Sequence, residues 1–143
     1  MADNEARARA LGVDEYLSAI YARPIGMKAL LAGLGYSQAA IDRLYADHLA
    51  ALVAQVVAGI EAQFEGDPDG MRLRFVMTRR YGMDGVAPAS LQEIGDALDI
   101  SRERVRQLAV KAIRRRKRAP EIERLAEILR GAADRCLGGA KEG

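Results

Sequence analysis

Apolar residues recur every three or four positions along most of the chain, and no stretch alternates regularly between apolar and polar residues. The first spacing is typical of amphipathic helices, whereas alternation would indicate strands. Ala, Leu, Arg and Glu, which are good helix formers, dominate the sequence. We therefore expect an all-α protein with helices at about residues 4–22, 25–32, 37–64, 68–81, 91–98, 101–118 and 120–136.

Residues typical of helix ends mark several of these boundaries. Ser90 and Glu93 have the spacing of a capping box, and Ser101 is a second serine at an expected helix start. Gly82 follows an expected helix and can adopt the left-handed conformation that ends helices. Asp67 precedes a proline, so the pair has the form of a cap followed by proline at the first helical position.

The expected helix at 37–64 contains an unusually apolar stretch, residues 49–60, with apolar side chains all round. A helix of this kind is buried on more than one side. It forms either the centre of a small domain, which is the simpler interpretation, or a contact with another protein. The stretch is shorter than the ~20 residues that cross a membrane, so no spanning segment is expected.

Charge is distributed unevenly along the chain. Residues 1–70 contain five Lys/Arg and ten Asp/Glu, whereas residues 71–143 contain seventeen and ten. Residues 102–118 alone contain nine basic residues and one acid. This asymmetry indicates two modules, the second able to bind a polyanion. We expect an acidic protein-interaction module at 1–64, a linker at 65–70, a basic module at 71–137 and a flexible tail at 138–143.

The composition argues against several classes of function. Cys136 and His48 are the single cysteine and the single histidine, so neither an internal disulfide nor the usual zinc and multi-histidine sites are expected. The sequence has no glycine-rich phosphate loop and no common catalytic motif. Its N-terminus lacks the apolar core of a signal peptide. We expect a cytoplasmic protein that is not an enzyme and binds no metal or cofactor.

Residues 91–110 have the pattern of a helix-turn-helix. Two short helices that cross over a tight turn need apolar residues at fixed offsets, and a small residue, here Gly95, where they cross. In such a motif the second helix enters the major groove of DNA. The alternative is a helical hairpin that does not touch DNA. The residues expected to close the small core are Ile94, Leu98, Ile100, Val105 and Leu108.

The second helix of the motif carries side chains suited to DNA. Its first turn usually meets base edges, whereas cations farther along the helix meet phosphates. Arginine can bind guanine, glutamate can accept from cytosine, and glutamine can pair with adenine. The candidate base-edge residues are Ser101, Arg102, Glu103, Arg104 and Gln107, and the candidate phosphate contacts are Arg106, Lys111, Arg114 and Arg115.

The segment RRYGMDG followed by SLQEIGDALDISRERVRQLAVKAIRRRKRAP resembles region 4 of the sigma-70 type sigma factors, over about residues 75–120. The resemblance implies a helix-turn-helix domain that reads the −35 promoter element and docks on the flap of RNA polymerase. It implies base reading by Arg102, Glu103 and Gln107, and backbone contacts by Arg106, Lys111 and the following basic run. It also brings two residues of the preceding helix near phosphates, Arg79 and Arg80.

The sequence departs from the family pattern in three respects. Nothing before residue 71 resembles region 2, which melts the −10 element, so we do not expect a complete sigma factor. Ala109 stands where the family has an acidic residue, and Arg116 replaces an apolar packing residue. The core near Arg116 must therefore differ from that of the family, or this turn is free to bind a polyanion.

These observations lead to one hypothesis and two alternatives. The hypothesis is a transcription regulator, such as a bacterial or phage-derived activator at the nucleoid, with a small N-terminal helical module and a region-4-like helix-turn-helix domain. It would bind promoter-like double-stranded DNA and RNA polymerase, and the N-terminal module would contact polymerase or a second copy of the chain. The alternatives are a polymerase-binding decoy, inhibitor or antiterminator without specific DNA binding, and a dimeric repressor.

Overall fold

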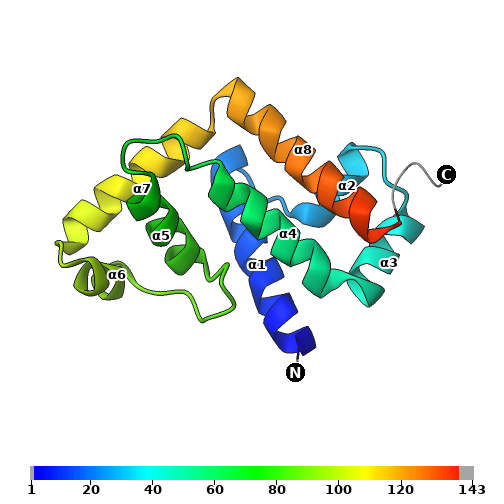
Figure 1. Cartoon of the computed structure of the whole chain (residues 1–143), viewed down its shortest axis with the longest axis horizontal. Coiled ribbons are helices and arrows are strands. Elements are labelled where there is room, and N and C mark those ends of the chain that lie inside the picture. Colours follow the sequence, from blue (N-terminus) through cyan, green and yellow to red (C-terminus); the bar gives the residue numbers. More distant parts are fainter. Residues whose placement is uncertain (1, 139–143) are drawn as a thin grey trace.

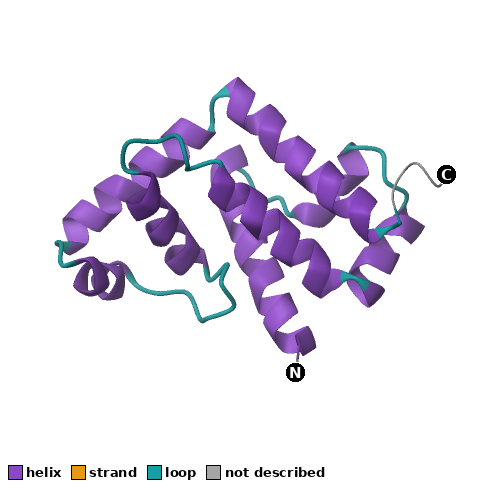
Figure 2. Cartoon of the chain, viewed as in Figure 1, coloured by secondary structure: helices purple, strands orange, loops and turns teal. Residues whose placement is uncertain are grey.

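The computed structural model describes residues 2–138, and over this range it consists of eight helices and connecting loops, without a strand (Figures 1 and 2). This confirms the all-α class expected from the sequence. The helices are α1 (Ala2–Tyr21), α2 (Met27–Gly33), α3 (Gln38–Asp47), α4 (Leu49–Ala62), α5 (Gly70–Tyr81), α6 (Leu91–Leu98), α7 (Arg102–Arg116) and α8 (Ala119–Cys136).

Helix α4 lies between α1 and α8, and these two pairs make the most extensive helix–helix contacts (Figure 1). Helices α5, α6 and α7 are gathered at one end of the molecule, and α2 and α3 at the other. Helix α8 follows α7 in the chain but runs back along α4. The basic half of the sequence therefore ends in a helix that packs on the acidic half, and the division at residues 65–70 remains a prediction.

The expected continuous helix at 37–64 is wrong, because two helices, α3 and α4, meet there at an angle of 96°. His48 lies between them with a φ of −132°, outside the helical region, and is at once the last cap of α3 and the first of α4. The bend allows the apolar faces of both helices to enter one core. If residues 38–62 formed one straight helix, the apolar face of α3 or that of α4 would lie outside this core.

The apolar stretch of α4 is part of the core. Its large side chains at positions 52, 53, 56, 57 and 60 are at most 2% exposed, and they pack in the same cluster as the buried residues of α1 and α8. Gly59 allows α8 to come close, because a Cβ atom there would lie 2.5 Å from Cγ2 of Ile128. The interpretation as ordinary core, rather than partner surface, is therefore correct for this stretch.

No single helix within residues 2–138 is long and apolar enough to cross a membrane. Helices α3 and α4 reach the required length and hydropathy only when taken together as a bent pair. The large side chains of α4 are buried among other helices of the protein, as expected for the core helix of a helical domain.

Helix α1 also packs on the end of α5, which begins the helix-turn-helix end of the molecule. The ring of Tyr16 meets the ring of Tyr81 edge to face, with 5.9 Å between centroids. Nε of Arg9 donates a hydrogen bond of 2.9 Å to the carbonyl of Met83. Gly12 lies against the carbonyl oxygen of Tyr81, where a Cβ atom would clash. The N-terminal helix thus holds α5 and the loop that follows it.

The expected cap at Asp67 is also wrong, since α5 begins at Gly70, two residues after the expected first helical position at Pro68. The Asp67 carboxylate does not cap a helix but pairs with the guanidinium of Arg116, at 2.8 Å, across from the end of α7. The remaining helix boundaries differ from expectation by at most two residues.

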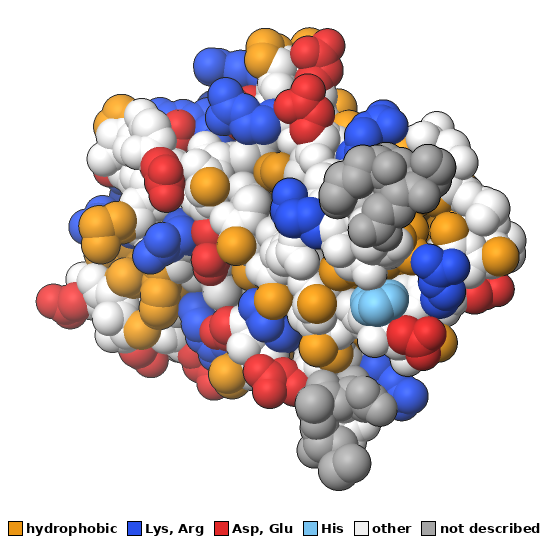
Figure 3. Space-filling model, turned by 45° about the vertical axis from the view of Figure 1, so that its right-hand side comes forward, with side chains coloured by type: hydrophobic (Ala, Val, Ile, Leu, Met, Phe, Trp, Pro, Cys, Tyr) orange, Lys and Arg blue, Asp and Glu red, His pale blue; other side chains and the backbone are white. Residues whose placement is uncertain are grey.

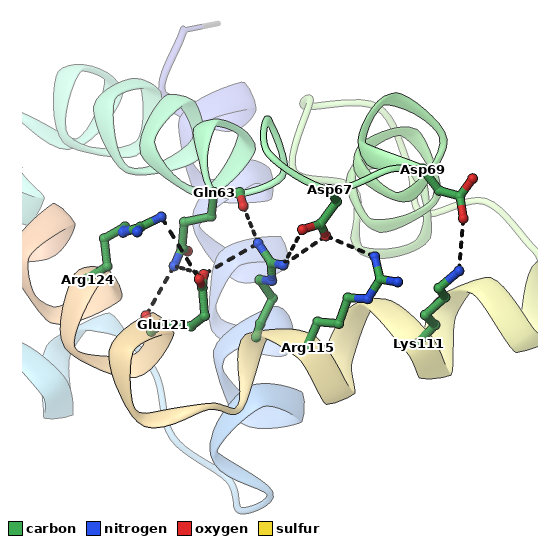
Figure 4. A network of polar contacts seen from close by, with 8 residues as sticks. Gln63, Asp67, Asp69, Lys111, Arg115, Glu121 and Arg124 are labelled. Carbon is green, nitrogen blue, oxygen red and sulfur yellow. Dashed lines mark hydrogen bonds and ion pairs between the residues drawn. The ribbon is translucent and has the colours of Figure 1, made fainter.

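A network of charged and polar side chains joins the end of α7 to three other parts of the chain (Figure 4). Arg116 contacts three of its members, Gln63, Asp67 and Glu121. The Arg116 side chain is only 4% exposed. Its guanidinium donates to the carbonyl of Gln63, pairs with Asp67, lies 3.4 Å from the Glu121 carboxylate, and stacks 4.8 Å from the centroid of Phe64. The first of the two expectations for this position is therefore correct: the core differs, and Arg116 is not free to bind a polyanion.

Replacing one member of this network tests its contribution to stability. We expect Asp67→Asn to lower the free energy of unfolding by about 3–5 kcal/mol, because it leaves the Arg116 charge buried with less compensation. Asp47→Asn, at an exposed position of α3, removes the same charge and is expected to change it by less than about 0.5 kcal/mol. Chemical denaturation measures both; equal stabilities would show that the buried pair contributes nothing.

Candidate nucleic-acid interface

Two serine caps set the helix starts of the helix-turn-helix, as expected. The Ser90 hydroxyl accepts from the amide of Glu93 at 3.1 Å, and the Glu93 carboxylate accepts from the amide of Ser90 at 2.8 Å, which completes a capping box. The hydrogen bond from the Ser90 amide holds the pKa of Glu93 below its usual value. Ser101 caps α7 by accepting from the amide of Arg104 at 3.0 Å.

The turn between α6 and α7 is closed by a left-handed residue and a glycine contact. Asp99 ends α6 with a φ of 58°, a conformation that aspartate tolerates better than most residues. A Cβ atom on Gly95 would lie 2.7 Å from the carbonyl oxygen of Ile100, which confirms that only a small residue fits there. Of the five expected core residues, three are fully buried and two are partly buried: Ile94, Val105 and Leu108, and Leu98 and Ile100.

The leading turns of α7 face away from the rest of the protein. Arg102, Glu103, Arg104, Arg106 and Gln107 are all exposed, so the acidic half of the chain does not cover them. Ion pairs and hydrogen bonds link these side chains along the helix: Arg106 pairs with Glu103 at 2.7 Å, and Arg104 donates to Gln107 at 3.3 Å. Because these side chains are exposed, their hydrogen-bond donors and acceptors can reach a partner without a rearrangement of the fold.

The Glu103 carboxylate is held in its charged form. The hydrogen bond from Arg106 is the main reason that the pKa of Glu103 lies below its usual value. A charged carboxylate only accepts hydrogen bonds, and the base edge that offers a matching donor in the major groove is the amino group of cytosine or adenine. The Arg106 guanidinium thus lowers the pKa of Glu103 and places a positive charge beside it.

A shallow groove runs along the outer flank of α7, between that helix and the ends of α5 and α6. Its described lining includes four cationic side chains and no acidic one, and its floor contains Leu91 and Ile113. Cations spaced along a groove suit a chain of phosphates, which determine affinity and register. The four cations are Arg80, Arg106, Arg114 and Lys117.

The other flank of α7 faces the acidic loop between α4 and α5. Nζ of Lys111 lies 2.8 Å from the Asp69 carboxylate, and the Arg115 guanidinium lies 3.5 Å from that of Asp67. The hydrogen bond from Lys111 lowers the pKa of Asp69 below its usual value. The structure therefore separates Lys111 and Arg115 from the cations of the outer groove.

The structure brings together only part of the predicted site. Arg79 is turned towards the loop after α5, where it pairs with Asp84 at 3.0 Å, whereas its neighbour Arg80 reaches the outer groove. Ser101 uses its hydroxyl as a cap, so that oxygen is engaged within the protein. The named candidates did not include Lys117, although the basic run after Lys111 contains it; its place three residues after Arg114, one helical turn, is the signal that singles it out.

On the face of the molecule drawn in Figure 3, acidic and basic side chains are interspersed, with hydrophobic side chains scattered among them. On this face, the charge asymmetry of the sequence does not appear as a division into one acidic and one basic area. It arises locally instead, where the cations of α7 outnumber their acidic partners.

Comparison with known proteins agrees with this geometry. The family model described as "Sigma-70, region 4" matches residues 71–117. These residues form a sigma-70 region 4 segment. The RNA polymerase sigma-C factor of Nostoc sp. (strain PCC 7120 / SAG 25.82 / UTEX 2576) is 52% identical over 44 residues, which are 31% of this chain and 11% of that protein. No solved structure matches the chain.

The region 4 segment comprises α5, α6 and α7 and ends at Lys117. Helices α1–α4 and α8 lie outside it, and the chain spans only about a tenth of the length of the curated relative. The sequence resemblance is thereby confirmed for one segment. In this chain α1 packs on α5 and α7 of that segment, and α8, which follows it, packs on α4.

Gly95 provides a test of how tightly the motif is packed. We expect Gly95→Ala to lower the free energy of unfolding by about 1–3 kcal/mol, because its methyl group would press on the backbone of the turn. Gly33→Ala is the matched control, since Gly33 also lies in a helix and has open space around its Cβ position. Thermal unfolding of both variants measures the difference. A Gly95→Ala variant as stable as the control would show that the backbone of the turn can move to accommodate a methyl group.

Proposed function

We propose that this protein is a DNA-binding transcription regulator that acts at promoters with RNA polymerase, by recruiting or redirecting it. The observation that carries this proposal is the exposed leading part of α7, in a region 4 segment and beside a groove lined with four cations. A recognition helix needs both a free polar face for bases and cations for the backbone on either side of it.

The base-reading residues in this proposal lie on the first two turns of α7. Arg102 and Gln107 match guanine and adenine edges, respectively, and Glu103 matches cytosine. Arg104 extends the same exposed surface, and the amides at the start of α7, near Ser101, favour a phosphate. The target is double-stranded DNA with a −35-like element.

The phosphate contacts in this proposal come from the outer groove. Arg80, Arg106 and Arg114 line it together with Lys117 and supply a continuous cationic edge. Arg106 pairs with Glu103, but both side chains are more than half exposed on α7, so a phosphate can compete for this arginine. Arg79, Lys111 and Arg115 pair with carboxylates of the loops in less exposed positions and contribute less. Residues 1–64 are the proposed site of a protein contact, with polymerase or with a second copy of the chain.

Substitutions on the two surfaces should have different effects on binding. We expect Arg102→Ala to cost about 1–3 kcal/mol on the preferred duplex and to relax the choice of base at one position. We expect Arg114→Ala to weaken binding to all sequences alike and to reduce the slope of log K against log salt by about one. Fluorescence anisotropy with a selected duplex and a random one, over a series of salt concentrations, measures both effects.

The result for Arg102 decides its role. An equal loss on selected and random DNA would place Arg102 among the phosphate contacts. Binding by the unmodified protein that does not depend on salt, or no binding to any duplex, would favour the alternative of a polymerase-binding decoy.

Purified RNA polymerase tests the second half of the proposal. We expect the protein to bind the core enzyme, and to raise the equilibrium constant for polymerase binding to the promoter about tenfold for each ~1.4 kcal/mol of added contact free energy. Pull-down with and without the native sigma factor distinguishes two modes: competition indicates a substitute, and co-binding a helper. Specific DNA binding by a dimer that ignores polymerase would instead indicate a repressor.

A further inference from the structure

The cations of α7 fall into two sets with different surroundings. Those of the outer groove are exposed, and the ion pair described among them, Arg106 with Glu103, lies on the surface of α7 itself with both side chains more than half exposed. Those of the inner flank, Lys111 and Arg115, face Asp69 and Asp67 in the α4–α5 loop (Figure 4). Lys111 and Arg115 are four residues apart, so they occupy the same side of the helix, one turn from each other.

We propose that the carboxylates of Asp67 and Asp69 act as an internal mimic of DNA phosphates. They occupy Lys111 and Arg115, keep the DNA backbone away from the inner flank, and so direct it along the outer groove. This inference rests on the proposed DNA binding and adds to it a residue that determines the position of the duplex on α7.

The Asp69 carboxylate is suited to this role by its position. It precedes the first residue of α5, at the positive end of that helix, where a negative charge is stabilised. Its carboxylate does not cap the helix and is therefore available to Lys111. Both partners are about one-third exposed, at 32% for Lys111 and 35% for Asp69, so a phosphate could reach the lysine if the aspartate were absent.

The loop that carries these carboxylates is held in place. Asp67 pairs with the buried Arg116, and Gly70 packs against the carbonyl of Phe64, where a side chain would clash. A phosphate approaching the inner flank therefore meets a fixed negative charge and cannot simply displace a mobile segment. Asp67 is unsuitable as a first test, because it also compensates the buried Arg116, whereas Asp69 pairs with the partly exposed Lys111.

Asp69→Asn is the direct test, because asparagine keeps the shape of the side chain and suits the cap position before a helix equally well. We expect it to bind duplex DNA more tightly, roughly five- to tenfold at 0.1 M salt, with a log K against log salt slope steeper by about 0.9, as for one added phosphate contact. Asp47→Asn on α3 changes net charge equally and controls for the overall field. Thermal unfolding verifies that both variants are folded.

Lys111→Gln, made in both backgrounds, identifies the cation that is released. We expect it to have little effect on DNA binding while Asp69 is present, and to remove the gain in affinity and slope when residue 69 is asparagine. This non-additivity is the signature of competition between carboxylate and phosphate for one lysine.

Three outcomes would overturn the inference. One is an Asp69→Asn variant that matches Asp47→Asn in affinity and slope. Another is a Lys111→Gln variant that already loses a full unit of slope in the presence of Asp69, which would show that Lys111 contacts phosphate in the native protein. In these two cases DNA binding itself persists and the proposed function stands. The third outcome, absence of DNA binding by every variant, would overturn the inference and the proposed function together.

Discussion

Arg116 carries a full charge in a place where its side chain is almost completely shielded from water. Such a charge is tolerated only if other groups compensate it, and here Asp67, Glu121 and the carbonyl of Gln63 do so. Each comes from a different part of the chain: the α4–α5 loop, the start of α8 and the end of α4. The requirement to compensate one buried guanidinium therefore fixes how α7 sits relative to the rest of the molecule.

The position of α7 determines which of its side chains are available to a partner. With the Arg116 side buried, the leading turn and the outer flank remain exposed, and the inner flank faces the acidic loop. Residues 102–118 contain nine basic residues. They nevertheless offer a polyanion far fewer free cations than this number suggests. Because the ion pairs occupy the cations of the inner flank, the free positive charge of α7 lies on its outer flank, which the composition alone does not show.

The region 4 segment is integrated into a larger helical core. Helix α1 meets the end of α5 through Tyr16 and Arg9, and α8 returns from the end of α7 to pack on α4. The buried apolar residues of both halves form one cluster. Movement of the segment as a separate unit would therefore open this cluster.

Local features of the sequence determined a large part of this structure. The helical class, the capping box at Ser90, the cap at Ser101 and the small residue at Gly95 follow from interactions between residues close in the chain, and all are present. The region 4 motif could be recognised for the same reason, since its side chains lie within one continuous segment. The DNA-reading roles assigned to Arg102, Glu103 and Gln107 remain predictions.

Only the tertiary structure decided the bend at His48, the return of α8 along α4, and the division of the α7 cations into two sets. Each depends on residues far apart in the sequence that meet because a common core must be filled or a buried charge compensated. Helical spacing can place Lys111 and Arg115 on a different side of α7 from Arg106 and Arg114, but it cannot show which side meets carboxylates. What distinguishes them is the acidic loop, more than forty residues earlier in the chain, that the fold brings to one flank of the helix.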